Sequence, residues 1–229
     1  RKFLTRFAEL LEKNGAHILT LSDTVGSLSP EETFKMFDDV KKELKESTAL
    51  SAHVHNDRGL ATANSLAAIR AGARQAHVTV GGLGERAGNA SLEELAIGAE
   101  DIARVRTGIR KHLLTPTVKE IARLGNFSLW SRQPIVGKGT MTHDSGIHLA
   151  ALAGFEPFNP RRVGGKRVLL YGRGVGTRAI ELLAASHGLK LTADQLSQIV
   201  VSIRKTGKTG RTLTETQALT RIQRYAAAA

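Results

Sequence analysis

Two histidines that stand two residues apart are the side chains of this sequence best suited to metal chemistry. His53 and His55 close a short apolar run that is typical of a buried strand. Because side chains alternate across a β-strand, both imidazole rings are expected on the same face of that strand. Neutral imidazole nitrogens are common ligands of divalent metals. The pair therefore predicts half of a metal site. The alternative is a structural role in which neighbouring carbonyl groups satisfy both rings.

Polar residues also follow the strands predicted on either side. One apolar run ends just before Thr24, and another, over residues 75–80, leads into a glycine-rich loop that closes at Asn89. Helices separate the three strands, as in parallel βαβ units, and the loops that follow such strands gather functional groups at one rim. Together the three loops favour an active site. As alternatives, Thr24 caps its own turn and Asn89 caps the helix that begins near Ser91.

Amphipathic helices are predicted between these strands and after them. The spacing of apolar residues places helices at about residues 3–14, 30–44, 60–71 and 91–106. Capping boxes are predicted at Ser29 with Glu32, Ser91 with Glu94, Thr192 with Gln195 and Thr214 with Gln217. After about Arg110 the alternation of strand and helix stops, and the rest of the chain is predicted to be mostly helical. We therefore expect a domain over residues 1–110 that contains three βα units, and a mostly helical subdomain over residues 111–229.

Composition narrows the classes of function. The 229 residues include no cysteine, which excludes disulfides and thiolate metal sites, and no apolar stretch is long enough to span a membrane. The formal net charge of +12 fits either a nucleic-acid partner or anionic small ligands. Aromatic residues make up only 4% of the chain and do not alternate with basic ones, which disfavours nucleic acid. We expect a cytoplasmic protein.

Four motifs occur in order along the chain. They read Asp-Thr-Val-Gly from residue 23, His-Val-His-Asn-Asp-Arg-Gly from residue 53, Gly-Leu-Gly-Glu-Arg-Ala-Gly-Asn from residue 82 and His-Asp-Ser-Gly-Ile-His from residue 143. In this combination the chain resembles, from residue 1 to about residue 180, the family of 2-isopropylmalate synthases and homocitrate synthases, whose relatives include citramalate synthases.

The resemblance implies a fold and an activity. The fold is a (β/α)8 TIM barrel that holds a divalent metal ion (zinc, manganese or magnesium), followed by a small, mostly helical subdomain. The family joins the acetyl group of acetyl-CoA to a 2-oxo acid and releases CoA, as part of amino-acid biosynthesis. Its members work as dimers, so a homodimer is expected here.

The resemblance also implies roles for individual residues. His53 and His55 would be metal ligands, and Asn89 a weaker or water-mediated ligand. Thr24 would contact the carboxylate of the 2-oxo acid. His148 would be a catalytic group that the subdomain delivers, in this family typically into the barrel of the partner subunit.

The sequence departs from the family in three respects. Only three barrel strands are predicted, so the chain corresponds to the C-terminal part of a barrel, and we expect either a fragment or a partner that supplies the N-terminal part. That part would contain the family's carboxylate metal ligand, an arginine and a catalytic glutamate. Phe155 stands where the family usually has tyrosine, and residues 171–176 replace a common Gly-Lys-His-Ser-Gly sequence. The alternatives are a non-catalytic or split-enzyme subunit and, less favoured, a basic nucleic-acid-binding protein.

Overall fold

The computed structural model describes residues 2–227 and divides the chain into two compact units. The first unit contains residues 1–130 and 134–136, and the second contains residues 131–133 and 137–229. The domain boundary predicted at residue 110 stays a prediction. Among the residues that the structure describes, no helix is long and apolar enough to cross a bilayer.

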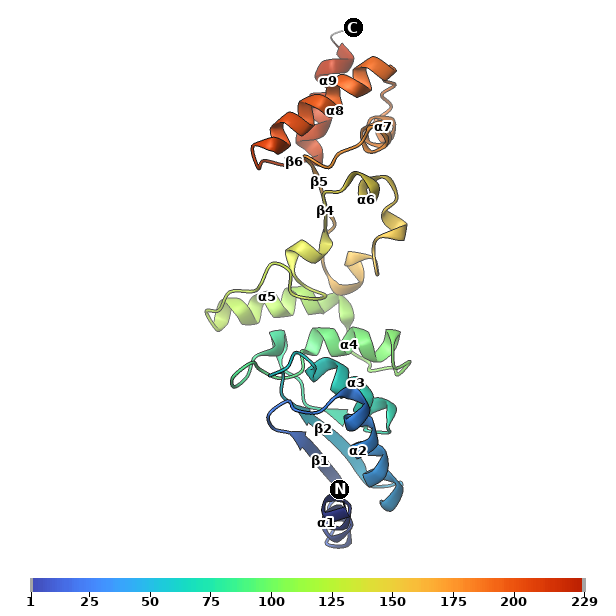
Figure 1. Ribbon diagram of the computed structural model, residues 1–229, viewed down its shortest axis with the longest axis vertical. Coiled ribbons are helices and arrows are strands. Elements are labelled where there is room, and N and C mark those ends of the chain that lie inside the picture. The colour runs from blue at the N-terminus through green and yellow to red at the C-terminus, as the bar shows by residue number, and fades with distance from the viewer. Residues whose placement is uncertain (1, 228–229) are drawn as a thin grey trace. The chain divides into compact units, whose positions relative to one another are not determined.

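A three-stranded parallel sheet organises the first unit (Figure 1). Its strands are β1 (Ile18–Asp23), β2 (Ala49–Val54) and β3 (Gln75–Ala76), and they lie in the order β1-β2-β3. The third strand is shorter than the predicted run over residues 75–80. After β3 the backbone of Thr79 forms a bridge with Ser91, and residues 80–82 form a 3₁₀ turn in which Gly81 has a φ of 69°.

Helices cover one face of this sheet. The helices of the first unit are α1 (Lys2–Lys13), α2 (Pro30–Glu43), α3 (Ala61–Arg70), α4 (Leu92–Asp101) and α5 (Leu114–Leu124), with 3₁₀ turns η1 (Val80–Gly82) and η2 (Lys111–Leu113). Buried side chains of β2 such as Leu50 and Val54 belong to one core with Phe37 of α2. Full burial of a side chain like Phe37 stabilises the fold by roughly 1.5–3 kcal/mol. The predicted end of α4 near residue 106 was wrong, since the helix ends at Asp101.

Local capping chemistry sets where the helices begin. Ser29 and Glu32 form the predicted capping box at the start of α2. At α4, Ser91 accepts a hydrogen bond from the backbone of Glu94, but the Glu94 carboxylate accepts one from the Thr62 hydroxyl at 2.7 Å. A tertiary contact therefore takes the place of half of that predicted box.

The second unit combines a small sheet with helices. Strands β4 (Thr142–His143), β5 (Val168–Tyr171) and β6 (Leu213–Thr214) lie in that order, the first pair parallel and the second antiparallel. Its helices are α6 (Gly146–Ala150), α7 (Thr177–Ser186), α8 (Ala193–Lys208) and α9 (Glu215–Ala227), with 3₁₀ turns η3 (Lys138–Met141), η4 (Leu152–Gly154) and η5 (Pro160–Val163). Fully buried isoleucines from α7, α8 and α9 form its core.

Candidate functional site

The two histidines of the predicted metal site lie together where β2 ends. The alternate residues Leu50, Ala52 and Val54 are buried in the helix-covered core, so His53 and His55 face the other side of the sheet. Their ring centroids are 5.0 Å apart, with the rings almost perpendicular. His53 belongs to β2 and His55 directly follows its last residue, so the predicted placement of the two imidazoles side by side at the strand end is confirmed.

A third imidazole, which the sequence analysis did not single out, lies beside them. The ring centroid of His77 is 5.4 Å from that of His53. The register of β2 and β3 pairs Ala52 with Ala76, so the next residues along the two strands are neighbours. The parallel pairing of β2 with β3 in this register is what could have identified His77 as a neighbour of His53.

Three atoms at this place are buried and have no hydrogen-bond partner: Nδ1 of His53, Nδ1 of His55 and Oδ1 of Asn89. An isolated bridge pairs the backbones of His55 and Asn89, and the Asn89 amide group donates to the Leu83 carbonyl at 3.1 Å, which leaves Oδ1 free. Buried polar atoms normally have partners. Two imidazole nitrogens and an amide oxygen are also suitable donors for a divalent cation. This set of residues therefore fits a metal ion.

The described residues do not supply enough side-chain ligands for a complete metal site. Within residues 2–227, no three histidine, cysteine, aspartate or glutamate side chains come close enough together to hold a metal ion. Burial lowers the pKa of His53, and the neighbouring rings of His55 and His77 lower it further. The lowered pKa favours the neutral imidazole, which is the form that binds metals.

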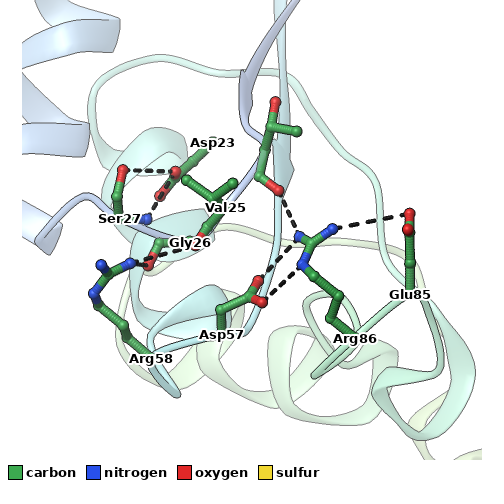
Figure 2. A network of polar contacts seen from close by, with 9 residues as sticks. Asp23, Val25, Gly26, Ser27, Asp57, Arg58, Glu85 and Arg86 are labelled. Carbon is green, nitrogen blue, oxygen red and sulfur yellow. Dashed lines mark hydrogen bonds and ion pairs between the residues drawn. The ribbon is translucent and has the colours of Figure 1, made fainter.

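Arg86 ties together the three loops that follow the strands (Figure 2). Its guanidinium donates to both carboxylate oxygens of Asp57, at 2.8 and 3.1 Å, and to the backbone carbonyl of Thr24 at 2.6 Å. It also lies 3.8 Å from the Glu85 carboxylate. The Arg86 side chain beside Asp57 holds the pKa of that carboxyl below its usual range. One side chain of the glycine-rich loop thereby fixes the ends of β1 and β2.

The turn that contains Thr24 is capped by its neighbour. The Asp23 carboxylate accepts hydrogen bonds from the backbone of Ser27 at 2.9 Å and of Leu28 at 3.0 Å. Gly26, with a φ of +58°, packs so closely on β2 that a Cβ there would lie 2.7 Å from the His55 carbonyl oxygen. Thr24 itself is exposed. The side chain of Asp23, not that of Thr24, therefore caps this turn. Likewise Ser91, not Asn89, caps α4.

His148 lies in the second unit, on α6, among its own polar neighbours. Its Nδ1 is 3.4 Å from Nδ1 of His143, whose Nε2 is 3.3 Å from the Glu156 carboxylate. The ring of Phe155 stacks on the ring of His148, with centroids 4.3 Å apart. The structure thus brings Thr24, His53, His55 and Asn89 together in the first unit, and His148 belongs to the second unit.

Comparisons with known proteins cover both units. The HMGL-like family model matches residues 1–121, and the model described as homocitrate synthase post-HMGL domain-like matches residues 135–211. A Methanopyrus kandleri protein provisionally named (R)-citramalate synthase is 40% identical over 205 residues, which are 88% of this chain and 40% of that protein. A 2-isopropylmalate synthase of Saccharolobus solfataricus is 38% identical over 207 residues, which are 87% of this chain and 53% of the relative. The chain thus spans about half or less of the length of these curated relatives.

A solved structure supports the fold. The HMG-CoA lyase of Bacillus subtilis superposes with a TM-score of 0.50 and 26% identity, over 56% of this chain and 45% of that chain. Together with the parallel βα units of residues 18–101, this likeness confirms the predicted fold class, the C-terminal part of a TIM barrel followed by a mostly helical part.

Proposed function

The chain belongs to the HMGL-like family, and we propose that it is part of a synthase that joins the acetyl group of acetyl-CoA to a 2-oxo acid and releases CoA. Two observations support the proposal. The relatives that are about 40% identical over most of the chain are named for products of such condensations. The donor atoms at the end of β2 are those that a metal-dependent member of the group would need.

The observation that carries the proposal is the trio of unpartnered donor atoms. His53, His55 and Asn89 would hold a divalent ion, zinc, manganese or magnesium, together with a carboxylate from elsewhere in the complete barrel. When bound, such an ion polarises the keto group of a 2-oxo acid and stabilises negative charge on its oxygen.

Other side chains would bind and orient the substrates. Thr24, exposed on the loop after β1, would contact the carboxylate of the 2-oxo acid, and Arg86 would keep that loop in place. His148 would move a proton during the condensation. The net charge of +12 would attract the phosphates of acetyl-CoA and the carboxylate of the acid. We also propose that the protein acts as a homodimer or with a partner that completes the barrel.

The direct test follows the thiol of CoA. This chain, assembled with the remaining barrel units, is mixed with acetyl-CoA, a divalent metal and one of three acids: pyruvate, 2-oxoisovalerate or 2-oxoglutarate. These acids would give citramalate, 2-isopropylmalate and homocitrate. We expect thiol release that requires one of these acids, and a loss of roughly 100-fold or more in His53→Ala. The matched control is His187→Ala in the second unit. Thiol release that is indifferent to the acid would contradict the proposal.

A second candidate is a subunit that keeps the fold without the chemistry. Phe155 favours it, because the ring that stacks on His148 lacks the hydroxyl that the family usually places there. This candidate predicts binding of the metal without any turnover in the assembled protein. Turnover with any of the three acids would exclude it.

A further inference from the structure

A row of four polar side chains crosses the second unit. Arg167 donates from Nε and Nη2 to the two carboxylate oxygens of Glu156, at 2.5 and 2.6 Å. Glu156 Oε1 lies 3.3 Å from Nε2 of His143, and Nδ1 of His143 lies 3.4 Å from Nδ1 of His148. The side chains of His143 and Glu156 are only 7% and 10% exposed. The two middle members of the row are therefore largely desolvated, and the row starts at the fixed charge of the partly exposed Arg167.

The chemistry of each group sets which atom carries the proton in these polar contacts. An ionised carboxylate only accepts, and the Arg167 guanidinium holds the pKa of Glu156 below its usual range, so the carboxylate stays ionised. His143 must then carry its proton on Nε2 to donate to Glu156. In a neutral ring this leaves Nδ1 as an acceptor. His148 can satisfy that acceptor only by donating from its own Nδ1.

We propose that Glu156 and His143 are positioning residues that hold neutral His148 in the Nδ1–H tautomer, with Nε2 as its free, proton-accepting nitrogen. The tautomer of His148 depends only on contacts within the second unit. Its use in catalysis rests on the function proposed above. In that role Nε2 takes a proton from the substrate: the new bond is Nε2–H, the electron pair stays on the substrate, and the Nδ1–H bond to His143 is kept.

The surroundings of His148 also fix the plane of its ring. Phe155 stacks on it at an interplanar angle of 24°. The turn before the ring is held by Gly146, whose backbone donates to the Gly174 carbonyl at 3.0 Å and where an added Cβ would lie 2.7 Å from that oxygen. The polar contact of the His148 ring is made through Nδ1, which lies 3.4 Å from Nδ1 of His143. The nitrogen assigned as the base is therefore the one left available.

Nitrogen NMR reads the tautomer directly. The 229-residue chain is labelled with ¹⁵N-histidine, and two-bond ¹H–¹⁵N spectra are recorded at pH 8, where ordinary histidines are neutral. We expect the pattern of an Nδ1–H ring for His148 and of an Nε2–H ring for His143. His148→Gln and His143→Gln, each of which removes one set of signals, assign the two rings. An Nε2–H pattern for His148, or a mixture of both forms, would overturn the proposal.

Variants of Glu156 and His143 test whether these two residues set the tautomer of His148. Glu156→Ala removes the acceptor, and His143→Phe replaces the intermediate imidazole with a ring that has no nitrogen. In each variant the His148 signals should therefore shift toward the mixture of tautomers of an unconstrained imidazole. His187→Phe is the matched control, because this exposed histidine on the same unit has its hydrogen bonds with Ser186 and Leu183, away from the row. Unchanged His148 signals in folded Glu156→Ala and His143→Phe would refute the positioning role, and circular dichroism establishes folding.

Turnover then separates this inference from the proposed function. In the assembled enzyme, His143→Phe should lower kcat about 10-fold or more and leave KM for the 2-oxo acid nearly unchanged, since a positioned acid or base contributes roughly 10²–10⁴-fold. If the wild-type assembly shows no condensation, the proposed function fails while the NMR result still decides the tautomer. If His143→Phe turns over like the wild type, the positioning role in catalysis is wrong.

Discussion

At the scale of single residues, the candidate site is distinguished by atoms that lack partners. The sequence contains eight histidines, and spacing alone singles out His53 and His55. Structure adds that their Nδ1 atoms are buried and unpaired together with Oδ1 of Asn89. His77 was missed because it has no motif of its own, and only the pairing of β2 with β3 brings it beside His53. Residue type and spacing can predict ligands along one strand, but not neighbours that strand pairing supplies.

Restoring a hydroxyl beside His148 should increase activity. In Phe155→Tyr the new oxygen would project from a ring already stacked on His148, 4.3 Å between centroids, and could share a proton with the substrate. We expect kcat of the assembled enzyme to rise, by less than the roughly 100-fold at the lower end of acid–base contributions. Phe158→Tyr, three residues further on, is the control. An unchanged or lower kcat in Phe155→Tyr would remove this residue from the account.

The Glu156–Arg167 pair should make stability depend on pH. The pKa of Glu156 is lowered in the folded state, so its contribution is present above about pH 4.3, the ordinary value for glutamate, and is lost as the pH falls through the folded value. Glu156→Gln should therefore lower the free energy of unfolding by roughly 1–2 kcal/mol at pH 7 and by less at pH 3.5.

Urea denaturation at the two pH values measures this difference. Glu181→Gln is the control, because its pair with Arg178 is more than half exposed and such pairs contribute little. A deficit in Glu156→Gln that is as large at pH 3.5 as at pH 7 would show that packing, not charge, is lost.

At the scale of elements, helix starts were predicted well and strand pairing less so. The capping boxes at Ser29 and Thr192 depend on four neighbouring residues, and both formed as predicted. The sheet of β4, β5 and β6 was not predicted, because it joins short strands from distant parts of the chain and such pairing leaves little local pattern. The glycine-rich loop was predicted as a loop, but the bridge between its last residue, Asn89, and His55 is a product of the tertiary fold.

One methyl group added to the glycine-rich loop, at Gly88, should have a measurable effect. A Cβ on Gly88, where φ is +89°, would overlap the carbonyl oxygen of Gly82 and displace the adjacent Asn89. Gly88→Ala should cost about 2 kcal/mol or more of stability and weaken metal binding. Gly108→Ala is the matched control, since its φ of +71° is also strained but open space surrounds it. Equal losses of metal affinity in the two variants would contradict the role given to the loop.

At the scale of the whole molecule, the first unit leaves apolar surface exposed. Phe3, Phe7 and Leu10 of α1 are 80%, 46% and 55% exposed, and β1 is an edge strand of its sheet. Surfaces of this kind are usually covered in a finished assembly. They agree with a chain that spans about half or less of the length of its relatives.

The isolated chain should therefore self-associate through this surface. Replacing Phe3 and Phe7 by lysine should reduce light scattering and the binding of a hydrophobic dye, because the exposed face of α1 becomes charged. Leu124→Lys combined with Val105→Lys makes the same change of charge on other exposed apolar residues of the first unit and serves as the control. If both double variants reduce association equally, the effect is one of net charge, and α1 has no special part in it.

The central claim is that two imidazoles and an amide at the end of β2 hold a divalent cation, and metal analysis of the assembled protein tests it most directly. Zinc, manganese and magnesium are titrated separately into wild type and variants by calorimetry. We predict one metal ion per chain in the wild type, loss of that ion in His53→Ala and in His55→Ala, and weaker binding in Asn89→Ala. His77→Ala, which removes the neighbouring imidazole, should retain it. Full metal binding by His53→Ala and His55→Ala would contradict the account.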